Sequence, residues 1–130
     1  MTSKHEYDDQ NIFAKILRGE IPNDKVTETE HSLAFKDIRP QAPVHVLVIP
    51  KGSYVDFEHF AAEASDEEIV DFIRTAGRIS AETGISRGGD GEGFRVIANT
   101  ATHGGQEVDH FHLHIIGGRA LGPMLSGGEG

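Results

Sequence analysis

Seven residues near the C-terminal end of the chain, from His110 to Ile116, alternate between histidine and apolar residues and then close on two isoleucines. A period of two is typical of a β-strand, in which residues i, i+2 and i+4 share one face. We expect the apolar residues Phe111, Leu113 and Ile115 to enter the core and the histidines to share the other face. Same-face neighbours on a strand lie roughly 7 Å apart, so three groups that titrate near neutral pH would form one patch. The histidines of this segment are His110, His112 and His114. The pattern predicts a functional site on this strand.

The rest of the chain carries patterns that predict an α+β fold. Alternating or β-branched segments predict further strands at residues 26–30, 33–37, 44–49 and 94–98. Asn11 or Asp9 is expected to cap a short helix that ends at Gly19. This order of elements predicts a five-stranded antiparallel sheet with one long and one short helix.

The long helix has the clearest start signal in the sequence. Ser65 is followed by Asp66-Glu67-Glu68, which is a capping box with acidic groups in the first helical turn. The apolar residues after it recur at helical spacing until Gly84, so we expect one face of this helix to be buried. The expected buried residues are Ile69, Phe72, Ile73, Ala76 and Ile79.

Composition excludes several classes of function. The chain has 130 residues and no cysteine, so it has no disulfide, no thiolate metal ligand and no cysteine nucleophile. Its formal net charge of −9 argues against nucleic acid as a partner, because phosphate backbones are normally bound by basic stripes. No apolar run approaches the roughly 18 residues of a membrane span, and residues 1–9 lack a signal-peptide core. We therefore expect a cytoplasmic protein without a membrane partner.

The sequence indicates one domain with two short flanking segments. We expect a disordered leader at residues 1–10, a single domain at residues 11–125 and a flexible tail at residues 126–130.

Three interpretations of the predicted histidine strand are possible. Alternate histidines on a strand have the spacing of Zn²⁺ ligands, and a third histidine could complete such a site. A histidine can also act as a phosphorus nucleophile or acid–base group while its neighbours orient it. The third reading is a solvated strand face without chemistry.

The surrounding residues favour phosphate chemistry over a metal. The loop from His103 to Gln106 contains two glycines, which leave room for an anion to approach the backbone N–H groups. Glu107 and Asp109 have the opposite strand parity to the histidines, so they are poorly placed as metal ligands. His45, on another predicted strand, can add a fourth imidazole to the patch.

The sequence resembles the histidine triad superfamily, whose signature is His-φ-His-φ-His-φ-φ, with φ apolar. Residues 110–116 match this signature at every position. The resemblance covers nearly the whole chain and is close to the Hint branch, the histidine triad nucleotide-binding proteins. The ending Leu121 to Leu125 is similar to bacterial members. Supporting segments are residues 12–16, 21–22, 33–38, 40–45, Asn99, 104–106 and 117–119.

The resemblance implies both an assembly and a reaction. It implies a homodimer whose two sheets join into one of ten strands. The implied activity is hydrolysis of purine nucleoside phosphoramidates, which are AMP or GMP conjugates with a P–N bond, without a metal or other cofactor. His112 would be the nucleophile that forms a nucleotidyl-histidine intermediate, and His114 would bind the phosphate and assist the leaving group. His110 and His45 would orient neighbouring imidazoles.

The resemblance also implies a nucleotide-binding pocket. Asp37 would accept hydrogen bonds from the ribose hydroxyls, and Asn99, Gly105 and Gln106 would lie near the phosphate. An apolar slot would take the base. The slot residues are Ile12, Phe13, Ile16, Ile21, Phe35 and Ile38.

One position departs from the pattern of many Hint members. Glu107 stands where a serine is common. Its carboxylate would repel a phosphate, so the resemblance implies a binding role only for the backbone N–H of this residue. Two alternatives to the phosphoramidate reaction stay open: hydrolysis of dinucleoside polyphosphates, and nucleotide binding or scaffolding with little turnover.

Overall fold

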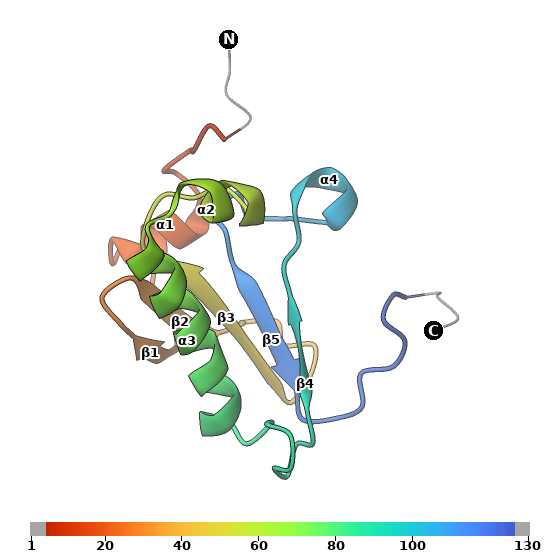
Figure 1. Ribbon diagram of the computed structural model, residues 1–130. Helices are drawn as coiled ribbons and strands as arrows, with labels where there is room; N and C mark the ends of the chain where they lie inside the picture. Colours follow the sequence, from red (N-terminus) through yellow and green to blue (C-terminus); the bar gives the residue numbers. More distant parts are fainter. Residues whose placement is uncertain (1–4, 127–130) are drawn as a thin grey trace.

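A five-stranded antiparallel sheet forms the centre of the computed structural model, which describes residues 5–126 (Figure 1). The strand order is β1-β2-β3-β5-β4, with every neighbouring pair antiparallel. The strands are β1 (Lys25–Glu28), β2 (Ser32–Lys36), β3 (Val44–Pro50), β4 (Phe94–Ile97) and β5 (Leu113–Gly117). The predicted α+β fold and its five strands are confirmed.

Within residues 5–126, four helices accompany the sheet, where one long and one short helix were expected. The additional two are α2 and α4, which are both short. The bounds are α1 (Ile12–Leu17), α2 (Phe57–Glu63), α3 (Asp66–Glu82) and α4 (Ala101–Gly104). Both predicted caps are present: the Asn11 side chain accepts from the Ala14 N–H, and Ser65 and Glu68 form the reciprocal capping box of α3. Asp56 caps α2 by accepting from the His59 N–H, which is a start signal that the sequence interpretation missed.

The two faces of the sheet pack against different helices. Figure 1 shows α3 lying across one face, where Phe72 and Ile79 join Phe111, Leu113 and Ile115 in the larger apolar cluster. On the other face, Phe13 and Ile16 of α1 pack against β2 and β3. Because alternate residues of a strand face opposite sides, the apolar residues of the histidine segment go to the α3 face. The histidines therefore go to the α1 face.

Ile73 is a correction to the predicted buried face of α3. Its side chain is 57% exposed, whereas Phe72 and Ile79 are buried. Each residue turns a helix by about 100°, so Ile73 lies a quarter turn beyond Phe72 and at the edge of the buried face. Val70 is likewise exposed, so this helix presents apolar side chains to solvent.

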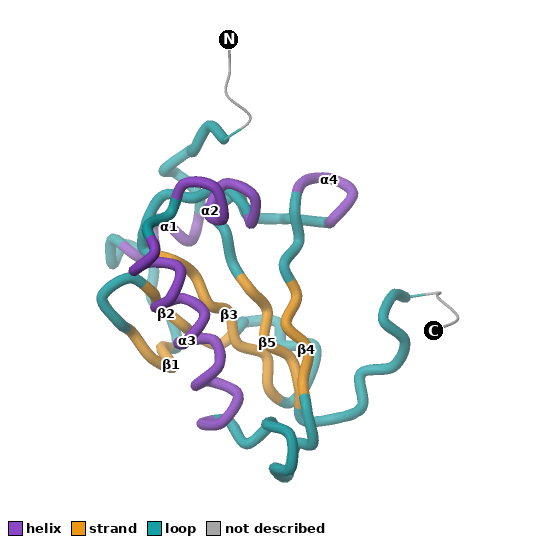
Figure 2. Tube along the Cα trace, viewed as in Figure 1, coloured by secondary structure: helices purple, strands orange, loops and turns teal. Residues whose placement is uncertain are grey.

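The loop that follows β5 is held to the domain by side-chain contacts. Figure 2 shows residues 118–126 as a loop that leads away from the sheet. The Arg95 guanidinium of β4 donates to the carbonyl oxygens of Gly122 and Pro123 in this loop. Within residues 5–126, no helix is long and apolar enough to cross a membrane. Most of the predicted tail and residues 1–4 of the predicted leader lie outside the described residues, and the disorder expected there stays a prediction.

Candidate active site

A cavity of about 570 Å³ opens on the α1 face of the sheet, and the histidine segment forms part of its wall. Residues predicted from the sequence for catalysis and for nucleotide binding meet here, although they come from α1, β2, the β2–β3 loop, β5 and the segment around α4. The predicted residues that line it are Ile12, Phe13, Ile16, Ile21, Phe35, Asp37, Ile38, Asn99, Gly105, Glu107, His112 and His114. His45, His110 and Gln106 lie outside the lining.

The histidine segment is only partly a regular strand, which is a correction to the expected strand over residues 110–116. β5 begins at Leu113, so His114 is the one triad histidine in the sheet ladder. His110 and His112 precede it and are buried, with 0% and 6% exposure. The predicted parity holds, but these imidazoles lie in the interior and do not form a half-exposed surface.

The ring of His112 is fixed by a backbone acceptor. Its Nδ1 lies 2.8 Å from the carbonyl oxygen of His110. A carbonyl oxygen only accepts hydrogen bonds, so the proton of neutral His112 is on Nδ1. Nε2 then carries the lone pair, on a ring that lines the cavity and meets Phe13 edge-on at 5.0 Å between ring centroids. This is the protonation pattern that a nitrogen nucleophile requires.

In the ring of His114 the proton is on the other nitrogen, Nε2. The backbone N–H of Gln41 donates to Nδ1 of His45 at 3.1 Å, so the proton of neutral His45 is on Nε2. That Nε2 lies 2.9 Å from Nδ1 of His114 and 3.4 Å from a carboxylate oxygen of Asp37. Nδ1 of His114 therefore accepts from His45, and the proton of His114 is on Nε2. The cavity wall thus combines a lone pair on His112 with an N–H donor on His114.

Burial keeps these imidazoles uncharged. Desolvation lowers the pKa of His110 to about 4 and, together with the neighbouring His112 and His45, lowers the pKa of His114 to about 4. Burial also lowers the pKa of His112 and of His45, against the opposing charge of Asp37. The site therefore holds neutral histidines near pH 7, as a nucleophilic imidazole needs.

The part of the cavity that is expected to hold a base and a ribose combines a carboxylate with an open apolar wall. Asp37 is partly buried, and its Oδ1 accepts from the Arg39 N–H at 2.8 Å. Ile12 and Ile38 line the cavity although they are 43% and 88% exposed. An apolar wall left open to water favours a flat, hydrophobic occupant, because covering the wall removes apolar surface from solvent. Phe13, Ile16 and Phe35 also belong to the core, so they serve packing as well.

The glycine loop differs from its expected form. Residues 101–104 make a helical turn, and the N–H groups of Gly104, Gly105 and Gln106 donate to carbonyl oxygens of residues 100–102. Gly105 ends it with a φ of 76°, a conformation that favours glycine. The Gln106 side chain donates to the carbonyl oxygens of Val55 and Val108, which is a structural contact. These N–H groups therefore do not form the expected anion cradle in this conformation.

Glu107 lies at the cavity, where its charge acts on His112. Its side chain is exposed, and it lines the cavity beside the histidines. The negative charge raises the pKa of His112, against the larger lowering by burial. The role of Glu107 in binding through its backbone N–H stays a prediction.

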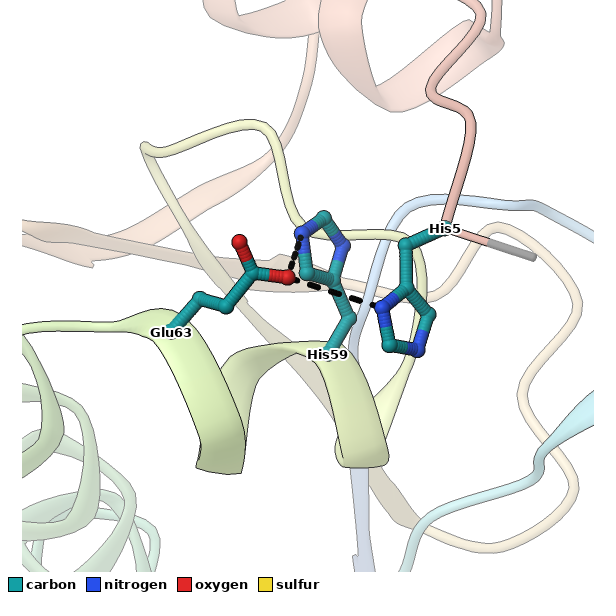
Figure 3. A group of neighbouring side chains, drawn as sticks. All are labelled: His5, His59 and Glu63. Carbon is teal, nitrogen blue, oxygen red and sulfur yellow. Dashed lines mark ion pairs between the residues drawn. The ribbon is translucent and has the colours of Figure 1, made fainter. Parts of the chain in front are cut away.

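In the part of the chain that the structure describes, two groups of side chains have the composition of metal sites, and in both a hydrogen bond opposes ligation. They are Asp37, His45 and His114 at the cavity, and His5, His59 and Glu63 beside α2 (Figure 3). A metal-bound histidine normally donates its other ring N–H to a neighbour. In contrast, Nδ1 of His45 accepts from Gln41, and Nδ1 of His59 accepts from the Val55 N–H at 2.9 Å. The proton of each ring is thus on Nε2, the atom that faces the other members of its group.

The structure adds residues that the sequence interpretation missed. Lys36 and Arg39 bring positive charge to the cavity wall, Leu47 and Val108 extend its apolar part, and the Gln41 N–H sets the tautomer of His45. Lys36 and Gln41 were noted only as parts of matching segments, and Leu47 only as part of a predicted strand. Arg39 and Val108 carry no signal in the sequence, because an isolated arginine or valine is far more often a surface or core residue.

The known proteins that are similar to this chain match it over most of its length. The HIT domain family matches residues 18–121. An uncharacterized 13.2 kDa HIT-like protein of Azospirillum brasilense is 50% identical over 122 residues, covering 94% of this chain and 97% of that protein. The purine nucleoside phosphoramidase of Escherichia coli K12 is 43% identical over 118 residues, covering 91% and 95%. The solved structure of a histidine triad protein from Clostridium difficile matches with a TM-score of 0.76 at 37% identity, covering 96% of this chain and all of that one (100%). The chain belongs to the HIT domain family.

Proposed function

We propose that this protein is a nucleotide hydrolase that cleaves the P–N bond of purine nucleoside phosphoramidates. The observation that carries the proposal is the pair of opposite tautomers in the cavity, which gives His112 a lone pair on Nε2 and His114 a proton on Nε2. The similarity to the purine nucleoside phosphoramidase of Escherichia coli supports the reaction class. The apolar wall and Asp37 fit the base and the ribose of a nucleotide.

The proposed reaction proceeds in two displacements. Nε2 of His112 forms a bond to the α-phosphorus, and the P–N bond breaks with its electron pair on the departing nitrogen, which takes up one proton. The N–H of His114 donates to the phosphate or to the leaving group as negative charge develops. Water then attacks the nucleotidyl-histidine, releases His112 and loses one proton. One water is consumed, and the products are a nucleoside monophosphate and an amine.

The first test is the release of AMP from adenosine 5′-phosphoramidate by metal-stripped protein. We expect release without added metal, because the histidine protons are placed for nucleophilic chemistry and against ligation. Activity that appears only after Zn²⁺ is added would contradict the mechanism. Faster cleavage of diadenosine polyphosphates than of the phosphoramidate would favour the polyphosphate alternative. AMP binding without turnover of any conjugate would favour a binding or scaffolding role.

Removing the Asp37 carboxylate should abolish the preference for a ribose with both hydroxyl groups. We expect the wild type to favour the ribose conjugate over its 2′,3′-dideoxy analogue by about 10- to 100-fold in kcat/KM, the scale of hydrogen bonds to a charged group. Asp37→Ala should treat the two substrates nearly equally. The ratio is the useful measurement, because loss of the Asp37–His45 contact affects both substrates alike. A variant that keeps the full preference would place the ribose elsewhere.

We also propose a homodimer formed through β4, which is an edge strand of the sheet. Val96 pairs with Ile115 and thus lies on the α3 face, where it is 50% exposed, and Ile73 on α3 is also exposed. An edge strand beside exposed apolar side chains favours antiparallel pairing with a second copy, which would give a ten-stranded sheet. We expect sedimentation equilibrium to give a mass of twice the 14.1 kDa chain, and Val96→Lys to shift the protein toward monomer. A monomeric wild type would contradict this proposal.

A further inference from the structure

The segment that precedes α1 reaches the buried histidine behind the cavity. The hydroxyl of Tyr7 lies 2.6 Å from Nδ1 of His110, across 103 residues of sequence. His110 is fully buried, and its ring meets the rings of Tyr7 and Phe13 edge-on. Tyr7 thus contacts the residue whose carbonyl oxygen holds His112.

The protons around His110 can be assigned from its partners. Nε2 lies 2.8 Å from the carbonyl oxygen of Pro50, which only accepts, so the proton of neutral His110 is on Nε2. Nδ1 is therefore an acceptor, and the Tyr7 hydroxyl is the donor. Burial, which lowers the pKa of His110 to about 4, keeps the ring in this neutral form.

The His110 carbonyl is held by side-chain contacts together with one backbone hydrogen bond of its own peptide unit. The pairing of β5 with β3 starts at Leu113, so His110 lies outside the ladder that orders the strand. Nearby, the N–H of Phe111 donates to the carbonyl oxygen of Tyr54 at 2.7 Å. The hydrogen bonds to Tyr7 and Pro50 hold the His110 ring from both sides, and its carbonyl accepts from Nδ1 of His112.

The segment that carries Tyr7 is anchored on either side of it. His5 stacks on His59 at 4.5 Å between ring centroids, and the Glu63 carboxylate lies 3.5 Å from the His5 ring and 3.3 Å from the His59 ring. Figure 3 shows the ion pairs of this carboxylate with both rings, with His59 and Glu63 on α2. On the other side, Arg18 donates to the carbonyl oxygen of Asp9 at 2.8 Å. Residues 5–9 thus form a strap from α2 to α1.

We propose that Tyr7 is a positioning residue for the reaction, and that its hydroxyl, through His110, holds His112 with Nε2 turned to the substrate. The inference rests on the proposed function for the identity of the nucleophile. The hydrogen-bond relay itself, from Tyr7 to His110 and from His112 to the His110 carbonyl, is a property of the fold. Tyr7 does not line the cavity, so its effect is on the alignment of His112.

The test compares Tyr7→Phe with Tyr54→Phe, since these are the two tyrosines of the chain. The Tyr54 hydroxyl donates to Glu68 on the α3 side, so its loss removes a hydrogen bond away from His110, His112 and His114. We expect Tyr7→Phe to lower kcat for the phosphoramidate about 10-fold with little change in KM, the scale of one lost hydrogen bond. Tyr54→Phe should keep the wild-type kcat.

Nitrogen NMR of the histidine rings tests the relay without turnover. The wild type should show His112 as a single tautomer protonated on Nδ1, and Tyr7→Phe should show a mixture of tautomers or a His112 Nδ1–H that exchanges faster. An unchanged His112 spectrum, or an equal loss of kcat in the two variants, would overturn the inference. A wild type that releases no AMP would refute the proposed function, and the spectra would still decide whether the relay exists.

Discussion

Replacing His112 by alanine should lower the rate of AMP release from adenosine 5′-phosphoramidate by at least about 10³-fold, the scale for the loss of a covalent nucleophile. The physical reason is the fixed lone pair on Nε2, because neither His114 nor His110 can replace it. Nδ1 of His114 accepts from His45, and both nitrogens of His110 are bonded behind the cavity. A single-turnover assay, which isolates the chemical step, is the appropriate measurement.

The matched control is His103→Ala. His103 is an exposed histidine of α4 and does not line the cavity, so we expect its variant to keep activity within about 2-fold of wild type, as is typical of surface substitutions. Thermal unfolding of both variants would show that each is folded. Mass spectrometry of acid-quenched wild type should detect a protein carrying one nucleotidyl group, and the His112 variant should not. Activity within 10-fold of wild type in His112→Ala would show that another group is the nucleophile.

The second large effect should be a loss of stability on mild acidification. The folded state holds His110 and His114 with pKa values of about 4, whereas the unfolded chain has the ordinary value of 6.5. Between these values the unfolded state binds more protons than the folded state, so the free energy of unfolding rises with pH. The contribution is therefore complete above pH 6.5 and is lost as the pH falls toward 4.

The size of this loss of stability can be estimated from His110, whose ring is fully buried. A shift of this size for His110 corresponds to about 3 kcal/mol, and His114, which is partly exposed, should contribute less. His112 and His45 act in the same direction. Carboxylates with lowered pKa values, such as Asp71 and Glu68, add a further loss only at lower pH, so the histidines dominate the window above pH 4.5.

Urea denaturation at several pH values between 4.5 and 7.5 measures this effect, and two variants separate its sources. His114→Gln removes one titrating ring while keeping a side chain that can hydrogen-bond to His45, so its stability should change less steeply with pH. The slope near pH 5 should be smaller by about 1 kcal/mol per pH unit. His103→Gln should keep the wild-type slope. A wild-type stability that is flat from pH 7 to 5 would show that these imidazoles are not held neutral by the fold.

Much of the local structure follows from short-range patterns in the sequence. The alternation in residues 110–116 correctly assigns Leu113 and Ile115 to one core and the histidines to the opposite face, since strand parity depends only on spacing. The capping box at Ser65 and the cap at Asn11 are read directly because their partners lie three residues away. Helix α2 was missed because its seven residues are too few for a clear periodic signal.

The chemistry of the site was decided by the tertiary structure. The triad spacing places the histidines on one face, but their protonation pattern depends on acceptors and donors that are distant in sequence. His45 meets His114 across 69 residues, Pro50 meets His110 across 60, and Tyr7 meets it across 103. Burial, which neutralises the imidazoles, likewise exists only after the sheet and α1 have closed over them. The sequence by itself determined which residues share a face, because that is a local property of the backbone. Which ring nitrogen carries a proton, and so what each histidine can do, was settled by long-range hydrogen bonds that only the folded chain brings together.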